Sequence, residues 1–446
     1  MAKLPAITPP DPTLEAVDRA IEARAAEELP RPRLGMSQIG EPCERRLWYS
    51  FRWAVSNPLP AAALYRIEDG HRTEELIASR LRMAPGVKLY TVDPSTGQQI
   101  ACVDHGGHFR GHLDGVVLGL AQAPKTWHVW ECKATGEDKQ AKLAKLKAER
   151  GEKAALAEWD PVYWAQAQVY MHYHGMSRHY LTCASPGGRT VVSVRTDADR
   201  DAAERLRTKA LRVITSSEPL PRLSEDPAWY QCKFCPTSAV CRGQKLPAVS
   251  CRTCAHATPE IASGPTGSAA GAARWSCARW NEDIPLDAQR TGCPEHRYIP
   301  ALITFAEQTD ADAAANWIEY RMPDGRAFVN CDPSALGPRA YTSAELLAID
   351  PAMIGEAGLD NLREAFGARV VAPSEPAPMP ESDGCYYRWS VDPSTGKPRL
   401  ARMVKGGGRA GGDAFMCWID AGHPDFQRCS AESFARAEKT SAKEAA

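Results

Sequence analysis

The spacing of apolar and polar residues divides the first half of the chain into helical and extended stretches. Residues 37–81 carry the apolar spacing of helices, and Cys43 opens one of them. Residues 88–133 change to short runs broken by Gly, Pro and Asp, which are typical of strands joined by turns. The remaining predicted elements are a helical stretch over 136–174, strands over 178–184 and 190–195, and a helix over 197–216. This order predicts a mixed α/β core.

The parts that flank this core have less regular patterns. The predicted order of regions is an N-terminal extension over 1–35, the core over 36–245, a Cys-rich module over 246–300 and a region without a readable role over 301–446. Repeated prolines over 367–384 indicate a linker. The Gly-rich basic stretch over 405–413 lacks the spacing of a Walker A motif and is expected to be a flexible loop.

The composition limits the class of protein. A hydrophobic fraction of 43% and a charged fraction of 24% are ordinary for a globular protein. No apolar run approaches the length of a membrane span, and the first residues lack the apolar region of a secretory signal, so we expect a cytoplasmic protein without membrane contact. The net charge of -1 excludes a uniformly basic surface but is compatible with a basic groove.

Two carboxylates lie at the ends of neighbouring predicted strands. Asp114 follows one strand, and Glu131 ends the next, two positions before Lys133. Adjacent strands can place both carboxylates side by side, where Mg²⁺ or Mn²⁺ would offset their repulsion and the Cys132 backbone carbonyl could join the metal shell. Glu131 and Lys133 share a strand face, which suits phosphodiester hydrolysis at a metal ion. The alternative is a surface Asp beside an ordinary Glu/Lys pair.

Four motifs follow one another in a fixed order. The motifs are Gly70–His71 in a predicted helix, G-x-x-D from Gly111 to Asp114, E-x-K from Glu131 to Lys133, and Q-x-x-x-Y from Gln166 to Tyr170 on a later helix. Over residues 36–243 this set resembles the RecB-type branch of the PD-(D/E)xK nucleases. Within that branch it is similar to the iron–sulfur subgroup, which includes AddB-type and CRISPR-associated exonucleases.

The resemblance implies a restriction-endonuclease-like fold, in which helices flank a mixed sheet. It implies that His71 joins Asp114 and Glu131 as a ligand of Mg²⁺ or Mn²⁺, that Lys133 positions the attacking water, and that Gln166 and Tyr170 support the substrate side. The expected activity is a deoxyribonuclease, mainly an exonuclease, that acts on single strands or DNA ends in repair, recombination or phage DNA processing. No P-loop motif occurs, so unwinding would need a helicase or recombination partner in trans.

Four cysteines bracket the predicted core. Cys43 precedes it, and Cys232, Cys235 and Cys241 follow it closely spaced. Disulfides do not persist in a reducing compartment, so closely spaced cysteines there indicate metal or cluster ligands. The split arrangement resembles that of the iron–sulfur nucleases, which implies a 4Fe–4S cluster that ties the two ends of the domain together. A four-cysteine zinc site is the alternative.

A second set of cysteines follows the first. Its members are Cys251, Cys254, Cys277 and Cys293, with His256 and His296 as substitute ligands. A CxxC pair followed by two later cysteines predicts a zinc site, and the alternative is a group of free cytosolic thiols.

Basic and aromatic residues suggest where DNA could bind. Arg45 and Arg46 adjoin Trp48, and Lys139 and Lys142 lie on the helix after the second acidic strand. Basic side chains contact phosphates and aromatic rings stack on unpaired bases, although a solvated helix face explains the lysines equally well. Two other functions remain open: a nuclease-like fold that grips DNA or protein without cutting, and an iron–sulfur redox sensor.

Overall fold

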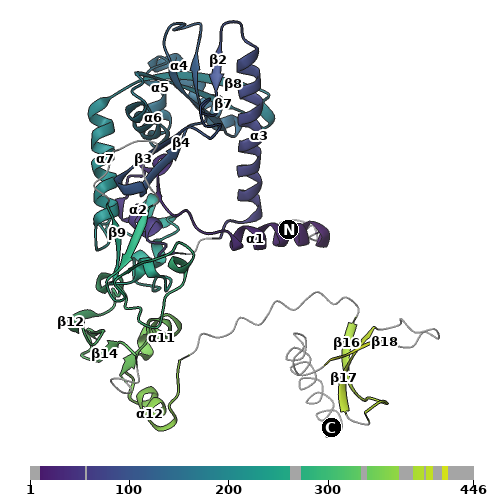
Figure 1. The fold of residues 1–446 in the computed structure, drawn as a ribbon, viewed down its shortest axis with the longest axis vertical. Coiled ribbons are helices and arrows are strands. Elements are labelled where there is room, and N and C mark those ends of the chain that lie inside the picture. The colour runs from purple at the N-terminus through teal and green to yellow at the C-terminus, as the bar shows by residue number, and fades with distance from the viewer. Residues whose placement is uncertain are drawn as a thin grey trace, which may run out of the picture. The chain divides into compact units, whose positions relative to one another are not determined.

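The computed structural model describes residues 11–55, 58–261, 273–332, 339–370, 385–395, 398–404 and 414–419. The chain forms two compact units, Met1–Ala372 and Pro373–Ala446 (Figure 1), and their boundary falls within the stretch 367–384 that is rich in proline. The further divisions expected at 35, 245 and 300 stay predictions. The Gly-rich stretch 405–413 lies outside the described residues.

A five-stranded mixed sheet forms the centre of the first unit. Its strands, in spatial order, are β2 (Lys88–Tyr90), β5 (Gly115–Leu118), β6 (His128–Ala134), β7 (Arg178–Ala184) and β8 (Val191–Asp197). β6 and β7 run parallel, whereas the other neighbours are antiparallel. The first five residues of β6 are all buried, as expected for a strand with both faces covered. The prediction of a mixed α/β core is confirmed.

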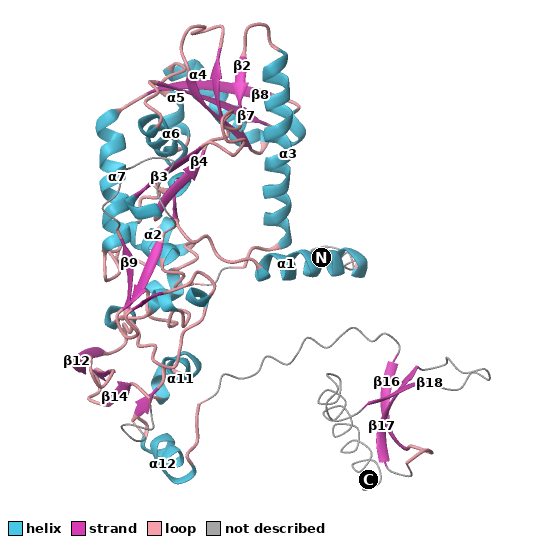
Figure 2. Cartoon of the chain, viewed as in Figure 1, coloured by secondary structure: helices cyan, strands magenta, loops and turns pink. Residues whose placement is uncertain are grey.

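Helices cover both faces of this sheet (Figure 2). The connection from β6 to β7 contains α4 (Glu137–Arg150), α5 (Ala155–Trp159) and α6 (Pro161–Tyr173), where the sequence had suggested one helical stretch. Asp160 separates α5 from α6. It caps α6, because its carboxylate accepts hydrogen bonds from the backbone N–H groups of Val162 and Tyr163. On the opposite face, Ile77 and Ala78 of α3 (Ala61–Met83) pack on Trp130. Two further helices, α2 (Glu44–Phe51) and α7 (Arg200–Thr215), pack against each other.

A second, three-stranded sheet lies beside the main sheet. Its order is β1 (Leu34–Gly35), β4 (Phe109–His112) and β3 (Ala101–Asp104), with β1 parallel to β4. β1 follows α1 (Pro12–Glu27), which packs on the start of α3. The segment expected to be an N-terminal extension therefore supplies a strand to the core.

The remaining described elements belong to the Cys-rich segment, to the end of the first unit and to the second unit. The Cys-rich segment, here residues 230–298, contains α8 (Tyr230–Lys233), α9 (Ser238–Cys241), β9 (Ala257–Glu260), β10 (Arg274–Cys277) and β11 (Glu282–Asp283). The end of the first unit contains β12 (Glu307–Asp312), β13 (Trp317–Arg321), β14 (Ala327–Asn330), β15 (Ala340–Tyr341), α11 (Ser343–Ala348) and α12 (Ala357–Phe366). In the second unit, β16 (Cys385–Val391), β17 (Pro398–Val404) and β18 (Ala414–Ile419) form an antiparallel sheet. Among the described residues, no helix is both long and apolar enough to cross a membrane.

The Cys-rich segment is packed into the core through two buried arginines. Arg252, which is 1% exposed, donates from Nη1 to the carbonyl of Phe51 at 2.8 Å. Arg52 donates in return from Nη1 to the carbonyl of Arg252 at 3.2 Å. Both guanidinium groups lie against the Trp275 ring, at 5.0 Å for Arg52 and 4.8 Å for Arg252. A buried guanidinium group is unfavourable unless its N–H groups find acceptors. Each of these arginines finds an acceptor on the other's segment, so the Cys-rich segment and α2 stabilise each other.

Candidate functional site

The predicted site residues converge on one cleft. The cleft has a volume of about 640 Å³ and lies between α3, β4, the end of β6, α6 and the segment 31–33. Its lining includes every residue of the four motifs that was expected to act, namely His71, Asp114, Glu131, Cys132, Lys133, Gln166 and Tyr170. The four motifs, which are spread over residues 70–170, meet here because β5 and β6 are neighbours in the sheet and α6 lies in the connection from β6 to β7.

Glu131 lies at the bottom of this cleft and is only 3% exposed. Its Oε1 atom accepts from the Lys133 ammonium and, at 2.7 Å, from Nε2 of Gln166. Its Oε2 atom is buried and has no hydrogen-bond partner among the described residues. Burial, and then the nearby Asp114 carboxylate, raise the pKa of Glu131. A buried carboxylate oxygen without a donor is unfavourable unless a proton or a cation satisfies it.

Asp114 and Lys133 flank Glu131. Asp114 is half-buried, and its Oδ2 atom accepts from the backbone N–H of Cys132 at 2.8 Å, so β6 fixes the position of the carboxylate. The Cys132 side chain is buried with Trp130 on the α3 side of the sheet. Burial alone would lower the pKa of Lys133, but Glu131 and Asp114 raise it well above its usual range. Lys133 therefore remains a cation beside the carboxylates.

Gln166 and Tyr170 come from α6 and are buried. The Tyr170 ring lies so close to Gly111 that a Cβ atom at that glycine would be 2.5 Å from its Cε1 atom. The same Cβ atom would be 2.9 Å from Cβ of Met36. The glycine of the G-x-x-D motif thus permits α6 to approach β4, and this approach brings Gln166 within reach of Glu131.

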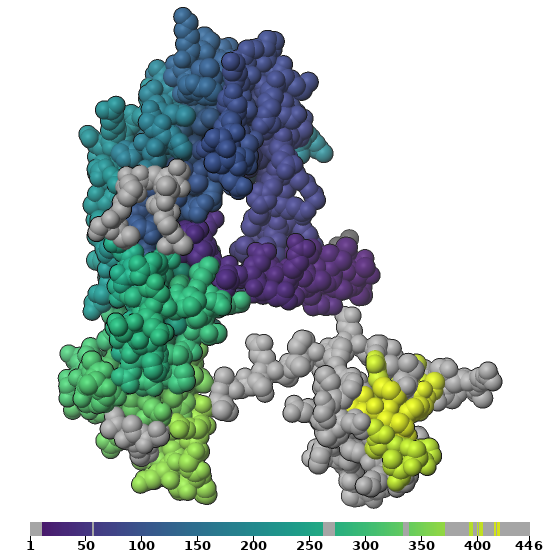
Figure 3. Space-filling model, viewed as in Figure 1, coloured from purple at the N-terminus to yellow at the C-terminus, as the bar shows by residue number. Residues whose placement is uncertain are grey.

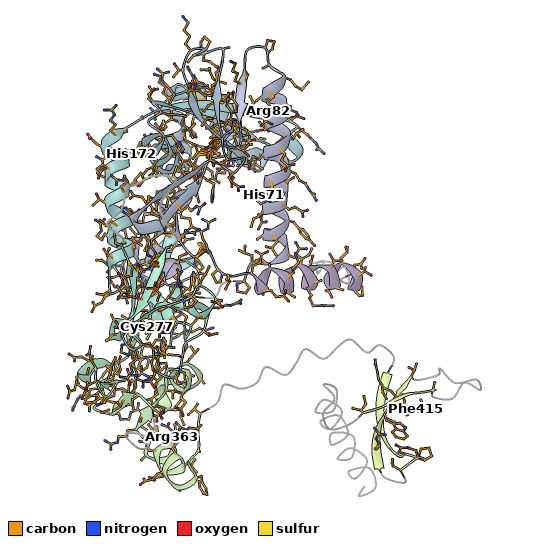
Figure 4. The ribbon with its side chains drawn as sticks, viewed as in Figure 1. His71, Arg82, His172, Cys277, Arg363 and Phe415 are labelled. Carbon is orange, nitrogen blue, oxygen red and sulfur yellow. The ribbon has the colours of Figure 1, made fainter. Side chains whose placement is uncertain are left out.

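α3 contributes two side chains to the cleft. His71, labelled in Figure 4, is exposed and lines the cleft, and Glu74 lies about one turn further along the same helix face. Burial, followed by the Asp114 carboxylate, raises the pKa of Glu74 to about 7. Glu74 was not predicted, although its spacing from His71 in Gly-His-Arg-Thr-Glu is a usable signal. We call Glu74, Asp114 and Glu131 the acidic wall.

The sequence also gave no indication of a group of arginines in this cleft. Arg31, Arg33 and Arg110 line the same cleft as the acidic wall. Two of them precede β1, and the third lies in β4.

The first set of cysteines lines one small cavity. Cys43 precedes α2 directly, Cys232 lies in α8, Cys235 follows it and Cys241 ends α9. All of them face a cavity of about 30 Å³ that Arg45, Arg46, Arg222 and Arg242 also line. The fold therefore brings the early cysteine to the three late ones, and the arginines place positive charge beside the thiols.

The second set lines a more open cavity of about 320 Å³. Cys251, Cys254, Cys277 and Cys293 border this cavity together with His256 and His296. Burial, followed by the other thiols, raises the pKa of Cys251 to about 11. In neither cavity, and nowhere else in the described ranges, do three or more His, Cys, Asp or Glu side chains form a group that could hold a metal ion as they stand.

Four of the five residues suggested as DNA contacts have other partners. Trp48 is 0% exposed, and its Nε1 donates to the carbonyl of Ser216 at 2.9 Å, so this ring cannot stack on a base in this conformation. Arg45 donates to the carbonyl of Leu220, and Arg46 to the Glu41 carboxylate. Lys139 forms an ion pair with Asp160 at 2.8 Å. Lys142 is exposed on α4 and remains a prediction.

Three solved structures resemble this chain distantly. No protein-family model matches it, and no curated protein matches it. The crystal structure of SSO0001 is 14% identical, with a TM-score of 0.30, over 51% of this chain and 96% of that one. The alkaline exonuclease LHK-Exo from Laribacter hongkongensis is 14% identical, with a TM-score of 0.29, over 43% of this chain and 87% of its own. LHK-Exo in complex with dAMP matches over 43% of this chain and 88% of its own, with the same identity and TM-score. The chain thus shows a distant structural likeness, over about half of its length, to proteins that include an alkaline exonuclease.

Proposed function

We propose that the cleft is the active site of a nuclease that hydrolyses DNA with Mg²⁺ or Mn²⁺. The observation that carries this proposal is the buried Glu131, whose Oε1 atom is bonded to Lys133 and Gln166 while its Oε2 atom has no partner in the described part of the chain. Mg²⁺ is commonly held by one or two carboxylates while water fills its remaining positions, so an acidic wall without a complete ligand cage fits such an ion.

The side chains suit distinct roles. Asp114 and Glu131 would hold the ion, with the exposed imidazole of His71 and the Cys132 carbonyl as further ligands. When bound, such an ion lowers the pKa of water and neutralises phosphate charge. Lys133 stays protonated and can orient the attacking water or stabilise the negative charge that develops on the phosphate. Gln166 holds the Glu131 carboxylate in place, and Tyr170 braces β4.

A closed frame around the cleft supports exonucleolytic action. The backbone N–H of Ala61 donates to Glu22 at 2.7 Å and the Tyr65 hydroxyl donates to Asp18 at 2.7 Å, so the start of α3 is held on α1. The chain after α1 returns to the core as β1, which pairs with β4. Figure 3 shows the resulting opening between α3 and the body of the first unit, with α1 on one side. A single strand with a free end can enter such a frame, whereas a duplex would need a partner in trans to separate its strands.

Cleavage assays test the proposed activity. Labelled single-stranded DNA should be degraded with Mn²⁺, and Asp114→Asn and Glu131→Gln should each abolish this cleavage while the fold is retained. Glu137→Gln and Asp138→Asn provide matched controls, because both residues are exposed at the start of α4. Binding of DNA by the wild-type protein without any cleavage would instead indicate the non-cutting module. Cleavage of linear but not circular single strands is expected for the frame.

We further propose that Cys43, Cys232, Cys235 and Cys241 hold a 4Fe–4S cluster, and that Cys251, Cys254, Cys277 and Cys293 hold zinc. The shared cavities and the chemistry of four thiols support both sites. The thiols would have to turn toward one another when the cluster or the zinc binds.

Spectroscopy and metal analysis test both sites. Anaerobically purified protein should absorb at roughly 400 nm, as thiolate-ligated clusters do, and should contain zinc. Loss of this absorbance in Cys235→Ser but not in Cys254→Ser would separate the two sets. If cluster oxidation changed DNA affinity while Glu131→Gln had no effect, the redox-sensor function would be favoured.

A further inference from the structure

Three arginines line the same cleft as the acidic wall. We propose that Arg31, Arg33 and Arg110, here called the arginine wall, bind a backbone phosphate of a nucleic-acid strand, next to the phosphate that is cleaved. The identity of the strand rests on the proposed function, whereas the anion site rests on the arginines themselves. Both walls line the same cleft, so one strand can contact them together.

The pairing of β1 with β4 builds the arginine wall. In this parallel pair, Gly35 is the register partner of Arg110, and Arg33 directly precedes β1. Arg31 lies over the same strand, because a Cβ atom added to Gly35 would be 2.3 Å from its Nη1 atom. The three guanidinium groups are thus gathered by backbone pairing between segments that are about 75 residues apart in the sequence.

Hydrogen bonds to the backbone hold this segment in place. Nε1 of Trp53 donates to the Arg31 carbonyl at 2.9 Å, and Nη2 of Arg252 donates to the Pro32 carbonyl at 2.9 Å. The backbone N–H of Leu34 donates to the His108 carbonyl at 2.8 Å. None of these bonds uses an arginine side chain of the wall. The wall is therefore preorganised while its guanidinium groups keep their donors for a ligand.

The positive charges of the arginine wall are not balanced by acidic partners. In the described ranges, none of the three side chains forms an ion pair with Asp or Glu, and Nε of Arg110 is buried without a hydrogen-bond partner. Burial, and then the charge of Arg110, lower the pKa of Arg33. Like charges gathered in a cleft repel one another, and a bound anion removes this cost.

Phosphate is the anion that this arrangement fits best. Guanidinium groups bind phosphate oxygens through paired N–H donors, and several of them can surround one tetrahedral group. A strand that bridges both walls meets the arginines with one phosphate and the acidic wall with the next.

Binding without catalysis tests the arginine wall independently of cleavage. The probe is a labelled oligothymidylate that carries no terminal phosphate, measured by fluorescence anisotropy in EDTA at several salt concentrations. Arg33→Gln and Arg110→Gln should each weaken binding about tenfold and reduce the slope of log affinity against log salt by about 0.7, the value for one phosphate contact on a single strand. Arg82→Gln is the matched control, since Arg82 lies on α3 (Figure 4), bonds to Leu89 and Thr91, and does not line the cleft.

A second variant separates position from charge. Gly35→Ala keeps every charge but places a methyl group where the Arg31 guanidinium lies, and that flexible group can move aside without unfolding the strand. Its affinity should fall several-fold with no change in net charge. Unchanged affinity and salt slope in both Arg33→Gln and Arg110→Gln would overturn the arginine wall, even if the wild-type protein cleaves DNA. Weakened binding in these variants of a protein that does not cleave would support the wall and refute the nuclease.

Discussion

The acidic wall and the arginine wall share one cleft but are held in different ways. The carboxylates of the acidic wall are buried or half-buried. Glu131 accepts hydrogen bonds from neighbouring side chains, and Asp114 accepts one from the β6 backbone. The arginine wall is held only through its backbone, and its guanidinium groups are left without acidic partners in the described residues. The side chains of the acidic wall are therefore held by hydrogen bonds, whereas in the arginine wall only the backbone is held.

This difference indicates that the two walls have different roles, one in the chemical step and the other in binding. A side chain whose position and protonation are set by buried neighbours suits a chemical step, because the geometry costs nothing to establish when the substrate arrives. A side chain with free donors on a fixed backbone suits binding. Substitutions in the acidic wall should therefore change the rate of cleavage, and those in the arginine wall should change affinity.

Lys133→Met gives the largest expected effect on this comparison. It removes the cation beside Glu131 and the group that can stabilise charge on the phosphate. We expect kcat for single-stranded DNA to fall by about 100- to 1000-fold, as when one preorganised donor is lost, while affinity in EDTA changes little. Lys145→Met is the control, because Lys145 is exposed on α4, does not line the cleft and forms only a surface ion pair with Glu149 at 3.8 Å. If binding fell as much as kcat, the two walls would not have separate roles.

Arg252→Met should release the support of the arginine wall. The side chain is fully enclosed and donates to Phe51, Pro32 and Gln289, so its loss leaves three acceptors with fewer donors. We expect the free energy of unfolding to fall by about 3 kcal/mol. Because Pro32 lies between two arginines of the wall, affinity for the oligothymidylate should also fall.

Urea unfolding and anisotropy measure these two effects of Arg252→Met. Arg274→Met is the matched control, since Arg274 is exposed on β10 and pairs with Asp283 at the surface. Loss of stability with unchanged affinity would show that the Cys-rich segment supports the core without positioning the wall.

The two walls also differ in how much the sequence could reveal. Asp114, Glu131 and Lys133 occur in short motifs on neighbouring strands, so local spacing predicts that they meet. Gln166 and Tyr170 were expected at the site because their motif resembles that of a known family, and helical spacing places both side chains on one face. No local pattern links Arg33 to Arg110, because only the β1–β4 pairing brings them together, and β1 is two residues long. Residues 1–35 look like a loose extension for the same reason.

Buried rings and buried charges were the other features that the sequence concealed. Trp48 lies among basic residues and resembles a stacking platform, yet it is enclosed because α2 packs on α7. The Cys-rich segment resembles a separate module in its spacing, but Arg252 anchors it in the core. Hydrophobic spacing does not show which partner covers a surface, and that partner is set by the tertiary fold.

Gly111→Ala sharpens the comparison from the side of the acidic wall. The new methyl group would meet the Tyr170 ring and Met36, so β4 and α6 must separate, at a cost of about 2 kcal/mol in unfolding free energy. Gln166 would then hold Glu131 less well, and kcat should fall. Adding Tyr170→Leu removes the clash with the ring but not the contact with Met36, so the double variant should lose less stability than the sum of the single variants, as urea unfolding would show. Strict additivity would contradict the close packing of Tyr170 on Gly111.

Asp104→Asn tests the scaffold of the arginine wall, and its expected effect is on stability alone. Asp104 is 4% exposed in β3, next to β4, and its Oδ2 atom accepts from the Arg207 guanidinium at 2.9 Å and from the Tyr173 hydroxyl. The variant should lower the free energy of unfolding by about 2 kcal/mol at neutral pH, because bonds to a charged acceptor are lost. Asp138→Asn, at an exposed position on α4, is the control and should have little effect.

The pH dependence of Asp104→Asn identifies the carboxylate as the cause. Burial acts to raise the pKa of Asp104, but the bonds from Tyr173 and from the His105 backbone, the His105 charge and the Arg207 bond lower it overall. The folded protein thus binds this proton less tightly than the unfolded chain, so the stabilisation is complete above the usual aspartate pKa of about 3.9 and is lost as the pH falls below it. The stability difference between wild type and Asp104→Asn should therefore shrink under acid conditions. If this stability difference stayed constant with pH, the loss in Asp104→Asn would come from packing rather than from charge. The ion pair of Asp104 with Arg207 would then not be what holds β3 and β4 in place.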